Sequence, residues 1–571
     1  MFIVIRRSLF LRPPSPTDGG LITNFNKNEF NHYNMNRIAI FGEPGTGKTT
    51  TAKKVAKLIN CKIIEASKAV VFPIASNFEK LPREDYLLKK LDKISKKRSR
   101  KVSREMAMNT FIRLKETYSP NFIARALHEI YVKNSKYKSV IFSGLRGLDN
   151  ANYCRLHNDL VVYLKADKKE LINRLRKEKG YTQQQALTEL KKEQNLYNTK
   201  KIEKVADLVL NTSTNDVTQV SKKILSKLES WNRMCKRCVN TGKNPTIKFD
   251  KNGYCNICSS YITHLNLTHL KKELDFLKSF KGTGKGKYDC LVGISGGKDS
   301  TATLDTIKQM EFTPLAVTLD LGYLPETTIP RAREIAKLLS TDYEVIDLRK
   351  YIRKIDLASY KKTIKLYKEP FTLETKIKFK KAYEIGRKHY SVRCKHSPIF
   401  VRTCQLCRRM VIRSYYSEAL KRGVNVMILG INEWTNLSAA QKGERYKVSG
   451  IRKLQPTKNK PAVYVFHLPF LLQRNSKDTK KILDKIGWSP PKGEDFIESN
   501  SNSCLYARST ERMAKRLLEF HPDSTRLARE VTVGFITKKQ ALKALGKIHP
   551  YKYTPRQVLE RAGIISKQNE K

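Results

Sequence analysis

The sequence predicts an α/β protein with two doubly wound parallel-sheet domains joined by a small cysteine-rich segment. Two stretches, at 36–60 and 288–309, each run from an apolar strand through a glycine-rich loop into a helix. Between them lie two Cys-x2-Cys pairs separated by sixteen residues. With 571 residues, 40% of them apolar, the chain is long enough to bury several cores.

The chain is strongly basic. It has 112 Lys and Arg residues against 53 Asp and Glu residues, a formal net charge of +59. Such a field attracts polyanions and predicts RNA as a partner, whereas the alternative is that these charges only solvate helices. No apolar run reaches the length of a membrane span, so we expect a cytoplasmic protein without one.

Cysteine spacing indicates metal or redox chemistry. Six of the eleven cysteines form three Cys-x2-Cys pairs, and the chain shows no convincing secretory signal. This pattern is typical of metal sites in a reducing compartment, not of disulfides. Residues 1–34 begin with a basic run broken by prolines, which predicts a disordered extension upstream of a second start at Met35. An organelle presequence is the alternative.

The first predicted domain covers 35–231. Its first loop satisfies G-x4-G-K-[ST], in which the backbone surrounds phosphates, Lys48 reaches the β and γ groups and Thr49 holds Mg²⁺. Further strands are expected near 62–66, 139–142 and 160–164. The residues predicted to bind ATP here are Gly42, Gly45, Gly47, Lys48, Thr49 and Thr50.

The second half of this domain resembles nucleoside-monophosphate and dephospho-coenzyme A kinases, in the strings DLVVYLKADKKELINRLRKEKG and VADLVLNTS. The resemblance implies a P-loop kinase-like fold whose lid places Arg174 and Arg176 over the phosphates. The sequence departs from it at Ser143 and Gly144, where relatives often carry an acidic residue that activates the acceptor. An ATP-gated or degenerate kinase is therefore the alternative to an active one, and Arg146 is either an acceptor ligand or a surface residue.

The segment 232–262 predicts a zinc knuckle. Four thiolates in two Cys-x2-Cys pairs suit tetrahedral Zn²⁺, and Gly253 provides the turn at the second pair. We interpret the site as a staple for folding, with a substrate clamp as the alternative. Its ligands are Cys235, Cys238, Cys255 and Cys258.

The second loop, in the domain predicted at 263–480, has the sequence SGGKDS. Gly296 and Gly297 let the backbone approach a ligand closely, and the N–H groups that precede a helix bind anions. The flanking serines add hydroxyl donors, a lysine adds positive charge and an aspartate adds a candidate Mg²⁺ ligand. The candidate ATP-binding residues are Ser295, Gly296 and Gly297, and the candidate catalytic residues are Lys298, Asp299 and Ser300.

SGGKDS resembles the fingerprint of the PP-loop ATP pyrophosphatases, which have a HUP-like sheet. The resemblance implies that ATP is split between its α and β phosphates and that AMP is left on a substrate oxygen, from which nitrogen or sulfur displaces it. It also implies that Asp320 and Gly322, which end the next strand, contact the nucleotide. Gly430, with Asn432 and Glu433, ends a later strand where open parallel sheets bind ligands.

Two branches of that superfamily are similar to this chain. The order of the knuckle CKRCV to YCNIC and the loop YDCLVGISGGKDS resembles N-acetyl sugar amidotransferases. This resemblance implies a carbonyl-bearing sugar acceptor and ammonia from a separate glutaminase subunit. The set Cys404, Cys407 and Cys504 resembles the tRNA-thiolating branch instead, where three thiolates hold an iron-sulfur cluster. A second zinc site that includes Cys394 or His396 is the other interpretation, and Cys290 is expected to be a buried apolar residue.

Residues 481–571 predict a helical region that packs on the catalytic sheet or on a partner. An adenylating amidotransferase is the leading hypothesis, with a tRNA thiotransferase second. The third is a nucleotide-gated binding module with a degenerate kinase half.

Overall fold

The computed structural model describes residues 36–95, 102–133, 139–197, 199–439, 443–490, 495–497, 504–547, 549 and 551–566. The expectations for residues 1–34 lie outside these residues. The described chain divides into two compact units, the first running to Ile224 without Arg155–Asn158 and the second comprising the remainder. None of the described helices combines the length and apolar composition that a bilayer crossing needs.

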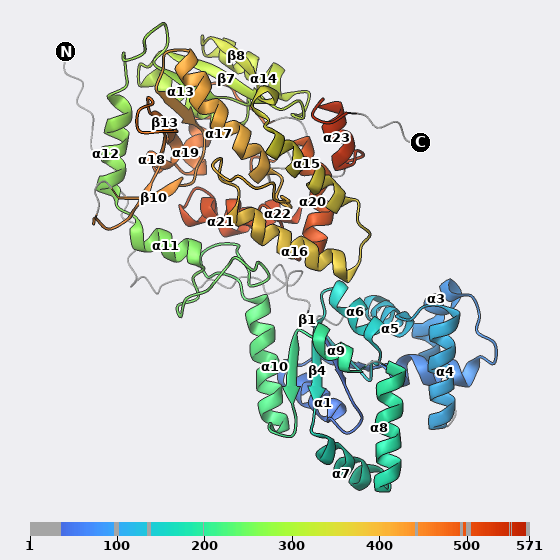
Figure 1. Ribbon diagram of the computed structural model, residues 1–571. Coiled ribbons are helices and arrows are strands. Elements are labelled where there is room, and N and C mark those ends of the chain that lie inside the picture. The colour runs from blue at the N-terminus through green and yellow to red at the C-terminus, as the bar shows by residue number, and fades with distance from the viewer. Residues whose placement is uncertain are drawn as a thin grey trace. The chain divides into compact units, whose positions relative to one another are not determined.

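The first unit is built on a parallel five-stranded sheet in the order β2-β3-β1-β4-β5 (Figure 1). The middle residues of its strands are apolar, and the side chains of Ile38 to Phe41 are fully buried, as expected of a parallel sheet with both faces covered. The strands are β1 (Asn36–Gly42), β2 (Lys62–Glu65), β3 (Ser139–Ser143), β4 (Leu160–Lys165) and β5 (Leu208–Asn211). The helices are α1 (Lys48–Ile59), the π-helix η1 (Ser67–Val71), α2 (Phe72–Asn77), α3 (Glu84–Ser95), α4 (Arg104–Thr117), α5 (Phe122–Lys133), α7 (Lys168–Lys179), α8 (Gln183–Tyr197) and α9 (Thr199–Val205). Two more, α6 (Leu148–Leu156) and α10 (Val217–Asn232), begin in this unit and end in residues assigned to the second.

The second unit contains a six-stranded sheet in the order β12-β13-β9-β6-β7-β8, parallel except for the edge strand β12. A separate antiparallel pair joins β10 to β11. The strands are β6 (Cys290–Gly293), β7 (Pro314–Asp320), β8 (Tyr343–Asp347), β9 (Val426–Leu429), β10 (Asn436–Ser438), β11 (Lys447–Ser449), β12 (Ile451–Leu454) and β13 (Val463–His467).

Helices enclose this second sheet as well. They are α11 (Asn256–His264), α12 (Leu267–Lys278), α13 (Lys298–Gln309), α14 (Thr328–Leu338), the 3-10 helix η2 (Leu348–Tyr351), α15 (Lys354–Tyr367), α16 (Leu373–Lys388), α17 (Cys404–Lys421), α18 (Leu468–Leu471), α19 (Ser476–Lys485), α20 (Leu505–Leu518), α21 (Ser524–Thr532), α22 (Lys538–Gly546) and α23 (Pro555–Arg561). Side chains that alternate along the strands enter two cores. Cys290 and Val292 pack with α21, whereas Leu291 packs with residues of α17 and α23.

Both sheets place a glycine loop at the carboxyl end of a central strand. In the first unit, β1 lies between β3 and β4. In the second, the chain runs outward from β6 through β7 to β8 and then crosses to β9 on the other side. Ligands of open parallel sheets bind where the strand order reverses in this way, so both loops occupy such positions. The prediction of α/β units with parallel sheets is confirmed.

Candidate functional site

The first loop requires glycine at three positions. Gly42, Gly45 and Gly47 have φ angles of 150°, 80° and 76°. A Cβ atom on Gly42 would lie 2.4 Å from the carbonyl oxygen of Leu164, so the strand β4 leaves no room for a side chain there. The loop therefore forms a tightly turned backbone directly before the N-terminus of α1, the arrangement that binds phosphate.

Lys48 lies under this loop. Its Nζ donates to the carbonyl oxygens of Gly42 at 2.9 Å and Glu43 at 2.7 Å. Burial, together with the neighbouring charge of Arg146, lowers the pKa of Lys48 to about 7. A bound phosphate would provide the negative charge that favours the protonated amine. Thr49 and Thr50 are exposed in the first turn of α1.

The arginines of the first unit differ in what they contact. Arg174 donates to the carbonyl oxygen of Gly45 at 3.2 Å and to Thr212, so it ties α7 to the first loop. Arg176 is exposed on the same helix. Arg146 pairs with Glu193, and its guanidinium lies 5.4 Å from the ring centre of Tyr197.

One acidic residue of this unit was missed by sequence reasoning. Glu65 at the end of β2 is the register partner of Ser143 on β3. Both residues line a cavity of about 430 Å³ that Thr49 also lines. The strand order puts a carboxylate beside the position where the sequence lacks one, and no local signal around Ser143 could have indicated it.

Side chains from outside the second loop hold its conformation through hydrogen bonds. Gly296 has a φ angle of 70°, and its carbonyl oxygen accepts hydrogen bonds of 2.9 Å from both Trp488 Nε1 and Arg331 Nε. Ser300 Oγ donates to the carbonyl oxygen of Gly297 at 3.0 Å and lies 3.3 Å from Ser295 Oγ. These contacts fix the loop with its two serine hydroxyls side by side.

Gly430 packs directly against the second loop. A Cβ atom at this position would lie 2.6 Å from the carbonyl oxygen of Asp299 and 2.8 Å from the backbone nitrogen of Ser300. The end of β9 can approach the start of α13 this closely only because residue 430 has no side chain.

A group of charges surrounds the second loop. Lys298 forms an ion pair with Asp299, whose Oδ1 is buried without a hydrogen-bond partner. Arg526 and Glu530 of α21 pair at 2.5 Å, and their charges act on the loop residues. Burial raises the pKa of Glu530 although Arg526 and Lys298 oppose the shift. Sequence reasoning missed both α21 residues because they lie more than two hundred positions from the loop.

The residues that end β7 have structural contacts of their own. Asp320 Oδ1 accepts the backbone N–H of Gly322 at 2.7 Å, which closes the turn. Gly322 has a φ angle of 85°, and a Cβ there would lie 3.0 Å from the carbonyl oxygen of Ala562. Their predicted contact with a nucleotide stays a prediction. Asn432, at the end of β9, is buried with an unpartnered Oδ1.

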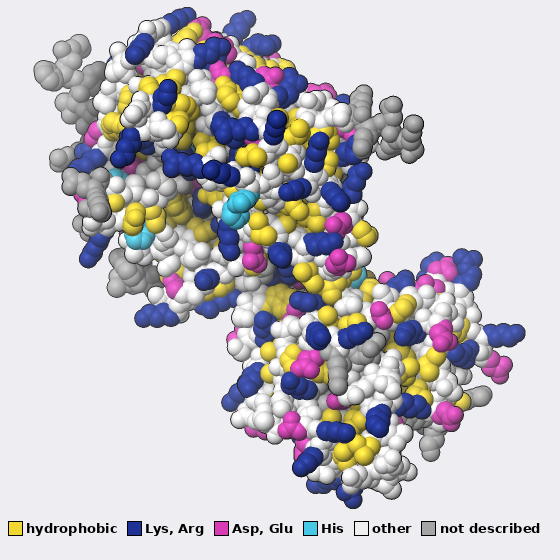
Figure 2. Space-filling view, viewed as in Figure 1, with side chains coloured by type: hydrophobic (Ala, Val, Ile, Leu, Met, Phe, Trp, Pro, Cys, Tyr) yellow, Lys and Arg dark blue, Asp and Glu magenta, His cyan; other side chains and the backbone are white. Residues whose placement is uncertain are grey.

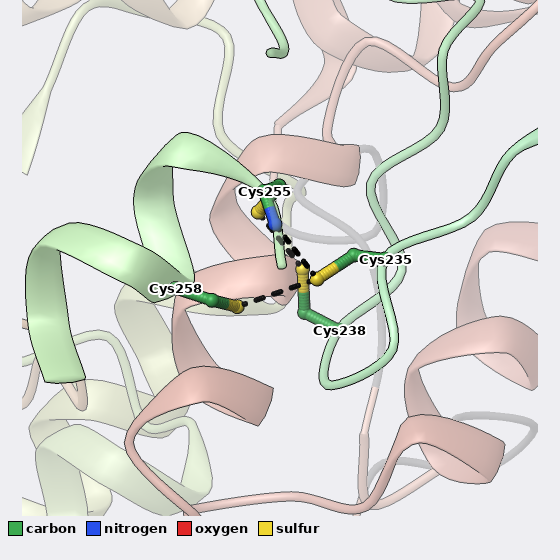
Figure 3. Close-up of side chains that lie close together, drawn as sticks. All are labelled: Cys235, Cys238, Cys255 and Cys258. Atoms are coloured by element: carbon green, nitrogen blue, oxygen red, sulfur yellow. Dashed lines mark hydrogen bonds between the residues drawn. The ribbon is translucent and has the colours of Figure 1, made fainter. Parts of the chain in front are cut away.

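The four cysteines of the knuckle meet in a buried cluster (Figure 3). Cys235 Sγ lies 3.7 Å from Cys258 Sγ, and Cys238 Sγ lies 3.5 Å from Cys255 Sγ. Sulfur atoms around one tetrahedral zinc ion, with Zn–S bonds of about 2.3 Å, are separated by about 3.8 Å. The spacing of the thiols therefore fits a single zinc ion, and Gly253, with a φ angle of 86°, forms the turn before Cys255.

Contacts around the sulfur atoms support that fit. The backbone N–H of Cys255 donates to Cys235 Sγ at 3.2 Å, and Asn240 Nδ2 donates to Cys255 Sγ at 3.4 Å. Thr532 Oγ1 at the end of α21 lies 3.0 Å from Cys258 Sγ. Hydrogen bonds of this kind orient thiolate ligands around a metal. Helix α21 thus contacts the cysteine cluster at one end and carries the charges near the second loop along its length.

The third cysteine set lines a cavity of about 360 Å³, here called the cysteine cavity. Cys404 and Cys407 come from the start of α17, and Cys504 precedes α20. The same cavity is lined by the ends of β7, β9 and β13. Burial raises the pKa of Cys407 to about 12, and its Sγ lies 2.8 Å from the hydroxyl of Tyr323.

These three thiols do not form a compact group. Among the described residues, the groups whose ligand atoms all lie within 4.8 Å of one another are the knuckle and the set His128, Cys154 and Asp159. Cys394, which the sequence offered as an additional ligand, lies 3.8 Å from His389 Nδ1. Cys290 is fully buried in the core.

Comparisons with known proteins identify a family for part of the first unit and relatives for longer or shorter parts of the chain. Residues 37–214 match the model of the Cytidylate kinase-like family. An uncharacterized protein of Methanocaldococcus jannaschii is 25% identical over 317 residues, which is 55% of this chain and 93% of that protein. A UPF0200 protein of the same organism is 31% identical over 126 residues, 22% of this chain, and the match spans about half (53%) of that protein.

Solved structures are similar to about a third of the chain. A shikimate kinase from Bacteroides thetaiotaomicron shares 15% identity over 34% of this chain and 98% of that chain, with a TM-score of 0.22. The protein TT1252 from Thermus thermophilus shares 18% identity over 34% of this chain and 97% of that chain, also with a TM-score of 0.22. From the family match, residues 37–214 form a P-loop, kinase-like nucleotide-binding domain.

Proposed function

We propose that the second unit is an ATP pyrophosphatase of the PP-loop type, which transfers AMP to an acceptor oxygen and releases pyrophosphate. The observation that carries this proposal is the position of the second loop. It follows the central strand β6 of an open parallel sheet, at the side where the strand order reverses, and precedes the N-terminus of α13. The proposed domain is the one expected at 263–480, with the helices of 481–571 completing its cores.

Each group of residues in the second loop has a different proposed role. Backbone N–H groups of Gly296 and Gly297 and the hydroxyls of Ser295 and Ser300 would bind the phosphates. Lys298 would neutralise charge that develops on the departing pyrophosphate. The unpartnered Oδ1 of Asp299 suits Mg²⁺, which takes oxygen ligands from carboxylates and phosphates and would draw charge from the phosphate oxygens.

The nucleophile that displaces AMP distinguishes two candidates. The first is an amidotransferase of the N-acetyl sugar type, which receives ammonia from a separate glutaminase. It is supported by the close coupling of knuckle and loop, since α21 contacts the knuckle cysteines through Thr532 and carries Arg526 and Glu530 near the loop. The knuckle would then be a structural zinc site.

The second candidate is a thiotransferase, and the cysteine cavity favours it. Cys404, Cys407 and Cys504 line one cavity at the carboxyl edge of the sheet. Their sulfurs are not gathered as a single ion requires, whereas in an iron-sulfur cluster each thiolate binds a different iron atom. The three residues would hold such a cluster, which supplies an open iron position for sulfide. Anaerobically purified protein should then contain iron and labile sulfide that Cys407→Ala removes; colourless, iron-free protein would eliminate this candidate.

The first unit would bind its own nucleotide and transfer a phosphoryl group. Glu65 provides a carboxylate in the cavity beside Thr49, so the absence of an acid at Ser143 does not leave the unit without a candidate base. If the carboxylate is too far from the acceptor, the unit serves as a nucleotide-gated module instead.

Product analysis tests these assignments. The full-length protein is incubated with [α-³²P]ATP, so that water takes the place of the unidentified acceptors, and AMP and ADP are separated by chromatography, with pyrophosphate measured in parallel. Lys298→Ala and Asp299→Ala should abolish AMP formation and leave ADP formation intact, and Lys48→Ala should do the reverse. AMP formation that survives Asp299→Ala would refute the proposal for the second unit.

A further inference from the structure

A second, larger cavity of the second unit has an unusual lining. It has a volume of about 760 Å³, and we call it the tyrosine cavity after Tyr351, Tyr390 and Tyr416. The described residues that line it include six Lys and Arg residues and no Asp or Glu. Lys and Arg side chains are also widespread on the face of this unit that Figure 2 shows.

Only some of these cations have acidic partners. Lys350 pairs with Glu418 at 2.6 Å, and Arg413 pairs with the buried Asp356. Three further cations of the lining are exposed and form no salt bridge with any described residue. They are Arg353, Arg393 and Lys453. Like charges collected in a concave surface repel one another, and an anionic ligand relieves that repulsion.

The positive charge continues into the cysteine cavity. Arg452 and Ile412 line both cavities. The hydrogen bonds of Arg452 to other described residues go to Thr435, with Nε 3.0 Å from its Oγ1. Burial, together with the charge of Arg408, lowers the pKa of Arg452 to about 10. Arg408 in turn lies 5.5 Å from the ring centre of Tyr390.

We propose that the tyrosine cavity binds a single strand of nucleic acid and that the adjoining nucleotide enters the cysteine cavity. The inference rests on the proposed function of the second unit. It names the class of the acceptor and agrees with the thiotransferase candidate, not with the sugar amidotransferase. Separate exposed cations suit successive phosphates, and tyrosine rings suit stacking of unpaired bases. A small phosphorylated compound would require only Arg408 and Arg452 of the cysteine cavity. It would not require the exposed cations Arg353, Arg393 and Lys453 of the larger tyrosine cavity.

Fluorescence anisotropy with the full-length protein tests the proposal. The probe is a fluorescein-labelled single strand of about twelve nucleotides, titrated without ATP at several KCl concentrations. The variant Arg353→Gln/Arg393→Gln/Lys453→Gln should bind at least about thirtyfold more weakly, and the slope of log K against log salt should fall by about two, since each lost single-strand phosphate contact removes about 0.7.

The matched control removes the same charge elsewhere. Lys271 and Lys272 on α12 and Lys481 on α19 are exposed, and their triple change to Gln should weaken binding less than about threefold. Tyr390→Leu should weaken binding about tenfold and leave the salt slope unchanged. Equal losses in the two triple variants would overturn the proposal, as would displacement of the strand by millimolar glucose 6-phosphate. Because ATP is absent, failure here is distinct from failure of pyrophosphate release.

Discussion

Replacing Gly430 with alanine should disable the second loop without unfolding the protein. The added Cβ would lie 2.6 Å from the carbonyl oxygen of Asp299, whereas ordinary contact begins at 3.4 Å, so the start of α13 must move by about 0.8 Å. The three nearest atoms, all within 3 Å, are backbone atoms of Asp299 and Ser300, which cannot rotate away as a side chain does. Gly430 is not among the glycines with positive φ, so the effect comes from contact alone.

The magnitude follows from that displacement. Overpacking of this kind costs about 1–3 kcal/mol of stability. A shift of nearly 1 Å in groups that hold reacting atoms costs about a hundredfold in rate, equivalent to about 2.7 kcal/mol in the barrier. We therefore expect AMP and pyrophosphate release to fall about a hundredfold, while ADP formation by the first unit is unchanged.

The assay compares Gly430→Ala with Gly286→Ala. Gly286 has open space around its added Cβ and no positive φ, so its variant should match the wild type. Rates of pyrophosphate release and urea unfolding curves are measured for both variants. If Gly430→Ala has the same stability and the same rate of pyrophosphate release as Gly286→Ala, then the close packing of the end of β9 does not position the second loop, and the reasoning is refuted.

Three further predictions concern the other sites. Because the pKa of Lys48 is lowered to about 7 and a bound triphosphate raises it, nucleotide binding to the first unit takes up a proton above pH 7. The affinity of the first unit for nucleotide, measured by calorimetry in the Lys298→Ala background, should fall up to tenfold per pH unit between pH 7 and 9. An affinity that does not change with pH would contradict the assignment of Lys48 as a phosphate ligand. Glu65→Gln should lower ADP formation about a hundredfold and leave AMP formation unchanged; equal ADP formation in the variant and the wild type would remove Glu65 as the base. Cys238→Ser should lose one zinc ion per chain by elemental analysis and should bind ATP more weakly at the second unit. The control Cys61→Ser should retain the zinc ion and the ATP affinity of the wild type. Normal ATP affinity in a zinc-free variant would show that the knuckle and the second loop are independent.

Sequence patterns predicted the parts of the structure that depend on local chain. The strand, glycine loop and helix of each unit were visible because apolar runs and glycines are adjacent in sequence. The strand β7 ends at Asp320 as expected, and β6 is shorter than the predicted run at 288–294. The four knuckle cysteines were identifiable because their spacing alone suits zinc.

The rest depends on which strands become neighbours. Glu65 lies beside Ser143 only because β2 pairs with β3. Trp488 and Arg331 brace Gly296 across separations of 192 and 35 positions. Arg174 was expected over the phosphates, and the structure has it holding the carbonyl oxygen of Gly45. No periodicity or motif records such pairings, since they are made by folding of the whole unit.

Helix α21, which has nine residues, connects the knuckle to the second loop. Thr532 at its end contacts a cysteine sulfur, and Arg526 and Glu530 on its preceding turns carry charge near the second loop. Zinc starvation, or an oxidant that couples the knuckle thiols, would loosen this helix and silence the second unit. The first unit, with its own core, would keep its proposed nucleotide turnover, so such stress would change the proportion of the two proposed activities and not merely their sum.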